Sequence, residues 1–452
     1  MKFLNIKHIL FLLLAALPVL HPLQAQIRIN EILAINSTVI HDPDFGEFSD
    51  FVELHNASAH AIQLAGYTLT DDAADKNKWE LPALTLLPGQ YLLIWTDGRD
   101  KHPGDTAYVA YKNAVTTMTA LHANFRLSGG GEYLALFNQQ GQKVDEVVYY
   151  TQTDDISFGR NAAEWQYLGE VTPGAANSAY GSATMERAGE PVFSLSEGFY
   201  AAPQVLQVSS SEPGAVIRFS FDGSTPNSQS PVFPANFPLN LTLSIKARLF
   251  VPGKMPGNVV TKTYFIHETP DLPVLSISTS AAHLYGFDFG ILQNAIKDRE
   301  VPATIEYFEP QTGERAFLSV AGLRVFGTSI YNLPQRPISV RFRAKYGDDV
   351  LKYPLFAGKP IPAYSSFLLR NGGNDYNNAF FRDGLAVNLV KGKMNLDYQD
   401  YQPCVVFING EYNGVYELRE RLDEAYIGNN HLVNPDDLDY LEDSLQVVAG
   451  AP

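Results

Sequence analysis

The sequence predicts a multidomain protein built mainly from β-sheet: two β-sandwich modules of the immunoglobulin-like type, followed by an α+β domain. The chain has 452 residues, a length that favours about three domains. Its 34 glycines and 28 prolines punctuate short stretches of alternating apolar and polar residues, which is typical of strands. The linker His267-Glu268-Thr269-Pro270 ends the second series of such stretches. We therefore divide the mature chain into residues 26–180, 190–267 and 272–452.

The charge balance excludes one class of partner. A formal net charge of -16 arises from 49 acids and 33 bases, whereas a nucleic-acid interface needs an excess of bases. We therefore expect no nucleic-acid partner, although a local basic cleft is compatible with this total. After the N-terminus no apolar run reaches about 18 residues, so the sequence predicts no transmembrane segment. Cys404 is the only cysteine, which leaves no internal disulfide.

Residues 1–25 have the pattern of a secretory signal peptide. Lys2 and Lys7 precede the apolar stretch 9–20, and Leu23-Gln24-Ala25 offers a cleavage site with a small final residue. The sequence therefore predicts export, to the cell surface or the extracellular space.

The first module, residues 26–180, contains six stretches with strand character: 27–32, 51–56, 67–70, 91–95, 133–137 and 144–149. Regular turns between short strands favour a β-sandwich. Asp42 and Asp44 lie two residues apart before Gly46, as acids do in calcium loops, but without the later glutamate of an EF-hand. Two interpretations stay open, a Ca²⁺ site at Asp42 and Asp44 or a solvated acidic loop.

The second module, residues 190–267, has strand patterns at 216–221, 243–250 and 260–265. Residues 222–227 form a turn rich in Asp, Gly, Ser, Pro and Asn. The third segment has strand patterns at 272–278, 302–308, 321–327 and 338–343. A helix is predicted over 381–391, with Leu385, Ala386 and Leu389 on one face and Gly392 at its end.

The stretch 405–420 predicts a hairpin around Asn409-Gly410, a pair that suits a two-residue type I′ turn. Alternation after the turn places Tyr416, Leu418 and Glu420 on one face, whereas Glu411 and Glu417 are assigned to solvent. A carboxylate on an apolar face is costly unless it is paired. We therefore expect an arginine or lysine of a neighbouring strand beside Glu420.

A polar cluster follows the apolar residues 367–369. It contains Arg370 and Asp375, and Arg382-Asp383 begins the helix after it. Polar groups at a junction of strand and helix can bind phosphate through charge and helix-terminal N–H groups. They can equally hold the loop to itself through Arg–Asp pairs and caps. Both interpretations stay open for Arg370 and Asp375.

Ordered phrases in the first two modules carry resemblances to known families. INEILA, DFVELHN, LPGQYLLIW and LHANFRLSGGGE, followed by SFGR and TPGAANS, resemble the lamin tail domain. IRFSFDGSTPN, SIKARLF and TKTYFI resemble the small β-sandwich found at the C-termini of chitobiases and hexosaminidases. Both resemblances imply accessory modules without catalysis, serving as a spacer or contacting a cell-surface glycan or protein.

The third segment resembles the CotH kinase-like family, named for spore-coat protein H. The matching phrases are LPVLSIS, VPATIEYF, GLRVFGTS, RFRAKYGDD, LLRNGGND, RDGLAVNL and FINGEYNGVYELRERLDE. The resemblance implies an atypical secreted protein kinase that transfers phosphate from ATP, with Mg²⁺, to serines of a protein phosphoacceptor. Glu420 and a paired base then become candidates for phosphate handling.

The chain departs from the family pattern in two places. On the fourth strand a basic-Ser-aromatic-basic pattern is expected; Arg336 keeps the first base, Pro337 replaces the serine and Ser339 takes the second basic position. Arg341 shares a face with Ser339 and can compensate. The nucleotide-binding candidates are Arg336, Arg341, Arg370, Asp375 and Glu420.

The second departure concerns the metal-binding and catalytic aspartates. The resemblance implies them in a Trp-Asp-x-Asp-like segment, which we expect downstream of Pro452; Asp436 and Asp437 instead suit a capped turn after Asn434. We therefore expect a fragment with an incomplete kinase-like domain, no metal site and no activity of its own. The alternative is a non-enzymatic surface scaffold that contacts proteins or carbohydrates.

Overall fold

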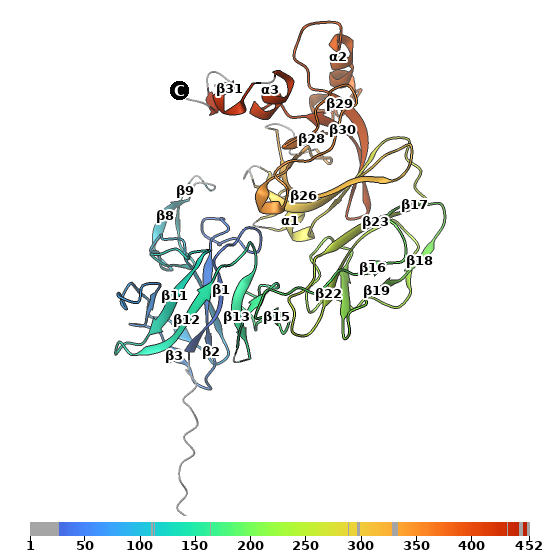
Figure 1. The fold of residues 1–452 in the computed structure, drawn as a ribbon. Coiled ribbons are helices and arrows are strands. Elements are labelled where there is room, and N and C mark those ends of the chain that lie inside the picture. Colours follow the sequence, from blue (N-terminus) through green and yellow to red (C-terminus); the bar gives the residue numbers. More distant parts are fainter. Residues whose placement is uncertain are drawn as a thin grey trace, which may run out of the picture.

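A computed structural model describes residues 27–109, 112, 114–162, 164–287, 289–295, 299–327, 333–431, 433–442 and 446–449. The chain folds into two β-sandwich modules and a third domain that combines a β-barrel with short helices (Figure 1). The predicted signal peptide, residues 1–25, lies outside the described residues. None of the helices in these ranges is long and apolar enough to cross a bilayer.

The first module is a sandwich of a seven-stranded and a four-stranded sheet. The seven-stranded sheet has the order β10 (Leu121–His122), β7 (Tyr91–Trp95), β2 (Phe51–Asn56), β1 (Ile27–Leu33), β13 (Ser157–Asn161), β14 (Glu164–Leu168) and β15 (Gly181–Ser182). The facing sheet has the order β12 (Lys143–Tyr150), β11 (Gly131–Phe137), β4 (Thr68–Thr70) and β5 (Trp79–Glu80). Two small pairs complete it: β3 (Ile62–Gln63) with β6 (Thr85–Leu86), and β8 (Thr106–Val109) with β9 (Ala114–Thr117).

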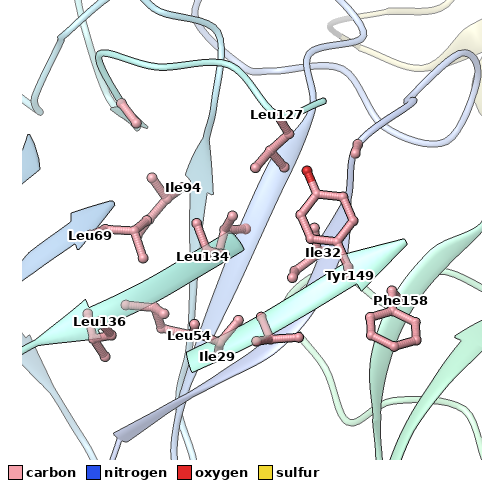
Figure 2. Packing of buried hydrophobic residues seen from close by; sticks show 14 of the residues in the cluster. Ile29, Ile32, Leu54, Leu69, Ile94, Leu127, Leu134, Leu136, Tyr149 and Phe158 are labelled. Atoms are coloured by element: carbon pink, nitrogen blue, oxygen red, sulfur yellow. The ribbon is translucent and has the colours of Figure 1, made fainter. Parts of the chain in front are cut away.

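Alternate side chains of the two sheets meet in one apolar core (Figure 2). Ile29 of β1 and Leu54 of β2 come from one sheet, and Leu134, Leu136 and Tyr149 come from β11 and β12 of the other. All five are buried, as the period of two in these strands predicts.

The second module has a four-stranded sheet and two strand pairs around a smaller core. The sheet has the order β17 (Gly198–Tyr200), β23 (Val260–Ile266), β22 (Leu243–Phe250) and β20 (Val216–Ser220). The pairs are β16 (Val192–Phe193) with β19 (Val208–Ser209), and β18 (Gln204–Leu206) with β21 (Phe237–Leu239). Its core gathers Leu206, Phe219, Leu239, Ile245 and Tyr264.

The third domain is a closed seven-stranded barrel. Its strand order is β24 (Val274–Ser278), β25 (Val301–Phe308), β26 (Arg315–Val325), β27 (Ile338–Arg341), β28 (Ser366–Arg370), β30 (Glu411–Glu420) and β29 (Tyr401–Ile408). The barrel closes where β29 pairs in parallel with β24. The helices are α1 (Ala281–Tyr285), α2 (Arg382–Val390) and α3 (Glu424–His431), with 3-10 turns η3 (Ala344–Tyr346), η4 (Gly373–Asp375) and η5 (Pro435–Asp437). A separate pair, β31 (Tyr440–Glu442) with β32 (Gln446–Ala449), follows.

The barrel interior is filled by one side chain in two along each strand. Ile277, Ile305, Val340, Phe367 and Leu418 belong to the same core cluster and are completely buried. The intervening residues point outward, so the barrel has an apolar inside and an outer face that can carry charge.

The predicted hairpin is confirmed. Asn409 and Gly410 have φ values of 51° and 83°, as a type I′ turn requires, and Ile408 pairs with Glu411 across it. The predicted helix is confirmed as α2, and the apolar face noted in its sequence is exposed: Leu385 and Leu389 retain 44% and 61% of their surface. The buried residue of α2 is Gly384, which lies against the ring of Tyr401 and leaves no room for a Cβ.

Candidate functional site

The outer face of the barrel carries a group of bases that the register of β26 and β27 brings together. Arg324 of β26 and Arg341 of β27 both point outward, because their neighbours Leu323, Val325 and Val340 fill the interior. Arg343 and Lys345 follow β27 directly, and Arg421 follows β30. We call Arg324, Arg341, Arg343, Lys345 and Arg421 the basic cluster.

Glu300 is the acid at the centre of the basic cluster. Its Oε1 lies 3.0 Å from Nε of Arg343 and 3.5 Å from Nζ of Lys345, and its Oε2 lies 3.8 Å from Nη1 of Arg341. Its side chain crosses β26 over Gly322, where any Cβ would meet the Glu300 carboxyl carbon at 2.6 Å. Because Gly322 has no side chain, the Glu300 side chain can pass over β26 and contact the three bases.

The basic cluster brings several positive charges close together. Glu300 contacts Arg341, Arg343 and Lys345, and Asp423 places Oδ2 3.6 Å from Nε of Arg421. Burial, then the charges of Arg341, Arg421 and Arg343, lower the pKa of Arg324 to about 10. Burial and the charge of Arg421 likewise lower the pKa of Arg341. Arginines that repel one another at a partly buried surface suit an anion that would relieve the repulsion.

A second group of charged residues on the outer face of the barrel is neutralised by ion pairs among its own members. Asp383 of α2 places Oδ2 3.0 Å from Nη1 of Arg370 and 3.0 Å from Nη1 of Arg419. Arg419, which is 1% exposed, also donates to Glu417 at 2.8 Å. The assignment of Glu417 to solvent is therefore wrong, because α2 and the neighbouring arginines cover this part of the outer face. Arg370 therefore forms an ion pair with Asp383.

Glu420 lies on the apolar inner side, as its alternation predicts, and is paired. Nζ of Lys359 lies 2.5 Å from its Oε2, and the backbone N–H of Asp400 donates to the same oxygen at 2.8 Å. The expected base exists, but it comes from the loop before β28 and not from a neighbouring strand. Asp400 in turn accepts two bonds from Lys391, at 2.6 and 2.7 Å. Burial raises the pKa of Glu420, and Lys359 partly offsets this.

The structure separates the other two candidates from the basic cluster. Asp375 accepts a hydrogen bond from Nε of Arg382 at 2.6 Å and from the backbone N–H of Arg382 at 3.2 Å. It therefore holds the loop before α2 in place. Arg336 lines a separate pocket with Tyr285 and Leu292, and its carbonyl accepts a bond from the Tyr416 hydroxyl. Of the five candidates, Arg341 alone belongs to the basic cluster.

The acids considered as metal ligands are held by donors of the chain. Asp42 accepts backbone bonds from Asp44, Phe45 and Glu47. Asp44 accepts from Thr119, Ala120 and His122. Carboxylates saturated in this way do not fit a Ca²⁺ site, which needs their lone pairs.

No group of three or more His, Cys, Asp or Glu suited to a metal ion occurs among the residues that the structure describes. Asn434 caps η5, because its side chain accepts from the backbone N–H of Asp436. This cap confirms the capped turn predicted for Asp436 and Asp437.

Sequence reasoning missed most of the basic cluster. It named Arg341 but not Arg324, Arg343, Lys345, Arg421 or the central Glu300. The signal available was the run of bases from 336 to 345 and the outward parity of Arg324 in an alternating strand. Lys359 had no local signal, since its position beside Glu420 depends on the path of a loop.

The three parts of the chain match three family models. Residues 22–151 match the lamin tail domain, residues 195–261 match the chitobiase/beta-hexosaminidase C-terminal domain, and residues 323–446 match the CotH kinase protein. The chain therefore carries a lamin tail domain, a chitobiase/hexosaminidase C-terminal domain and a CotH kinase-like domain. The CotH match begins within β26, whereas the closed barrel already begins at β24.

No curated protein gives a significant match. A crystal structure of murine CEACAM1b is 11% identical and covers 53% of this chain and 99% of its own, with a TM-score of 0.13.

Proposed function

We propose that the CotH kinase-like domain binds the phosphates of ATP at the basic cluster, and that its activity is transfer of a phosphoryl group to a serine of a partner protein. We further propose that the chain is exported and that the two sandwich modules present this domain at the cell surface or outside the cell. The signal-like residues 1–25 support export.

One observation carries the proposal: five bases meet on one outer surface of the barrel in a chain whose net charge is -16. Guanidinium groups form bidentate hydrogen bonds with phosphate oxygens. Phosphoryl transfer depends on positive groups that neutralise the charge developing on the phosphate. Arg341 and Arg343 are the central candidates, because the only acid that they contact among described residues is the shared Glu300.

The described residues do not fit a Mg²⁺ site of their own. Glu300, Asp383, Glu417 and Asp423, the acids of this outer face, are each engaged in ion pairs. A divalent ion would have to displace a paired base from one of them. We therefore assign binding and charge neutralisation to these residues, and no step that passes through a metal.

A second candidate function is a non-enzymatic surface scaffold. The observation that favours it is the same engagement of the acids, because a kinase also uses a free carboxylate to position the attacking hydroxyl. In that case the second module would contribute contacts to proteins or carbohydrates, in keeping with its family likeness.

Isothermal titration of the full chain with ATP tests the proposed binding. Arg341→Ala should weaken binding about tenfold or more, because a charge-assisted bond is worth roughly 1.5–3 kcal/mol. Arg336→Ala is the matched control, since Arg336 lies outside the basic cluster, and it should bind as the native chain does. Equal affinities for all three proteins, or no binding at all, would contradict the proposal.

Transfer of labelled phosphate from ATP to a serine-rich protein then separates the two functions. Label that appears with the native chain and is reduced in Arg341→Ala supports a kinase. Nucleotide binding without any label supports a binding protein.

A further inference from the structure

A cavity of about 480 Å³ lies between the second module and the barrel, and its lining also includes Thr38 of the first module. One wall comes from the second module, with Lys246 of β22 and Val260 and Thr261 of β23. The other comes from β25, β26 and the start of α1, including Leu318 and Val320. This volume lies in the range of small-molecule sites. The cavity therefore exists only where the second module and the barrel meet.

The two walls are joined firmly. Phe199 and Phe265 of the second module pack with Val274, Phe308 and Phe407 of the barrel in one apolar cluster. Contacts of this kind, between large aromatic side chains, hold two modules at a fixed separation.

Polar contacts reinforce the junction. Arg315 of β26 bridges Glu306 of the barrel at 2.9 Å and Glu197 of the second module at 2.7 Å. The side chain of Asn409 donates to the carbonyl of Asp222 in the second module and to the carbonyl of Thr279 in the barrel domain. The cavity is therefore a fixed feature of the junction.

Lys246 is the polar centre of the cavity. It is 7% exposed, and its Nζ donates to the carbonyls of Gly223 at 2.9 Å and Ser278 at 3.4 Å. Its third N–H has no acceptor, and no carboxylate lies within ion-pair distance, in the part of the chain that the structure describes. Burying an ammonium that has no ion-pair partner is costly. Burial accordingly lowers the pKa of Lys246 to about 8, and the charges of Asp222 and Glu306 offset this only in part.

The other titratable groups of the lining already have partners in the protein or are exposed to water. Arg315 is held by its two glutamates, and Nδ1 of His283 lies 3.0 Å from the hydroxyl of Thr279. Glu190, at the rim, is exposed to water, which screens its charge. Lys246 is thus the group that would meet an anion.

The rest of the lining favours an aliphatic ligand body. Val259, Val260, Leu318 and Val320 form an apolar side, of which Leu318 and Val320 remain 43% and 37% exposed. Among the described residues that line the cavity, the imidazole of His283 is the only aromatic ring, so this lining lacks the flat surface on which sugar rings commonly stack. This argues against a glycan here, although hydroxyls of Thr261, Thr279 and Ser280 are close.

We propose that this cavity binds a small carboxylate with an aliphatic body, whose carboxylate pairs with Lys246 and whose chain lies against Leu318 and Val320. The site is independent of the nucleotide site proposed above, because its lining contains no member of the basic cluster. The ligand would bridge the second module and the barrel.

Titration of the full chain with octanoate tests the proposal, with 1-octanol as the uncharged probe of similar length. Octanoate should bind saturably, and octanol at least tenfold more weakly. Lys246→Met should reduce octanoate affinity at least tenfold. Lys262→Met is the matched control, since Lys262 lies on the neighbouring strand β23 and pairs with Glu197. It should leave the affinity unchanged.

Val320→Trp provides a second variant, which fills the cavity from a half-exposed position and leaves Lys246 intact. It should also abolish octanoate binding, and circular dichroism shows whether each variant is folded. The proposal is overturned if octanoate gives no saturable binding, if octanol binds equally well, or if folded Lys246→Met or Val320→Trp binds as the native chain does.

Discussion

Nζ of Lys359 lies 2.5 Å from Oε2 of Glu420, although 61 residues separate the two along the chain. Both side chains are nearly buried, at 8% and 3% exposure. Tyr398 and Tyr426 place their rings 4.7 and 4.8 Å from the same ammonium. The pair therefore joins the loop before β28 to β30, and the pocket that Glu420 lines is too small for a nucleotide. Its role in this structure is to hold a loop against β30.

Removing the base alone should destabilise the barrel. Lys359→Met would leave the Glu420 carboxylate buried without a partner, which costs about 3–5 kcal/mol. Urea unfolding followed by circular dichroism measures the loss. Lys352→Met, at an exposed lysine of the same loop, should change stability by less than about 0.5 kcal/mol. The double variant Lys359→Met/Glu420→Leu should recover most of the stability, and a double variant as unstable as the single one would refute the pairing.

The thiol of Cys404 should report on the opening of the barrel. It is completely buried among interior side chains, and burial raises its pKa to about 12. Because only the thiolate reacts, a disulfide reagent should label the native chain very slowly and the unfolded chain at once. Lys359→Met should increase the labelling rate. Rapid stoichiometric labelling of the folded native chain would contradict a closed barrel.

The first module should lose stability as pH rises from about 5 to 8. Burial raises the pKa of Glu31 and of Glu53 to about 7, and that of Asp50 to about 6. The folded state therefore binds more protons than the unfolded state between the ordinary pKa of these groups, about 4, and about 7. The stabilisation that these three groups give is greatest below that window and falls as pH rises through it.

His122 acts in the same direction. Burial opposes its charge, but the bond to Asp97 at 2.8 Å and the contact with Asp44 raise its pKa above the ordinary value. Its contribution is complete below the pKa of the unfolded state and is lost as pH rises through the folded value.

Tryptophan fluorescence isolates these pH effects, because Trp79, Trp95 and Trp165 all belong to the first module. The urea midpoint of the fluorescence change should fall between pH 5 and pH 8. Glu31→Gln should make this fall smaller, by removing one of the shifted groups. A midpoint that rises with pH would contradict the assignment.

The turn residue Asn409 should stabilise the junction of the second module and the barrel. Its side chain accepts from the N–H of Thr279 at 3.0 Å and donates to two carbonyls, while its backbone has positive φ. Asn409→Ala should cost about 1–3 kcal/mol, since the N–H of Thr279 and the two carbonyls lose their partner. Glu411→Ala, at the exposed neighbour across the turn, should be nearly neutral in the same urea experiment. Equal effects of the two substitutions would mean that the cross-module bonds contribute nothing.

Local sequence patterns were sufficient to predict several of the strands and one turn. Alternation predicted β1, β2 and β20 within a residue or two, and Asn-Gly predicted the turn of the β29–β30 hairpin. These features depend on neighbours in the chain, where side-chain parity and turn chemistry decide the outcome.

What the patterns missed depends on contacts between distant segments. Glu417 has the parity of an outward residue, yet α2 covers it and Arg419 pairs with it. The face of α2 with Leu385 and Leu389 stays exposed because Gly384 is the residue that contacts β29. Arg324, Arg341 and Arg421 meet only because three strands of a closed barrel bring them to one surface.

The most direct test of the basic cluster is a crystal structure of the chain with a non-hydrolysable ATP analogue. The account predicts phosphate oxygens within about 3 Å of the guanidinium of Arg341 and of at least one of Arg343 and Arg421. A nucleotide whose phosphates lie beside Lys359 and Glu420, or anywhere away from these arginines, would contradict it.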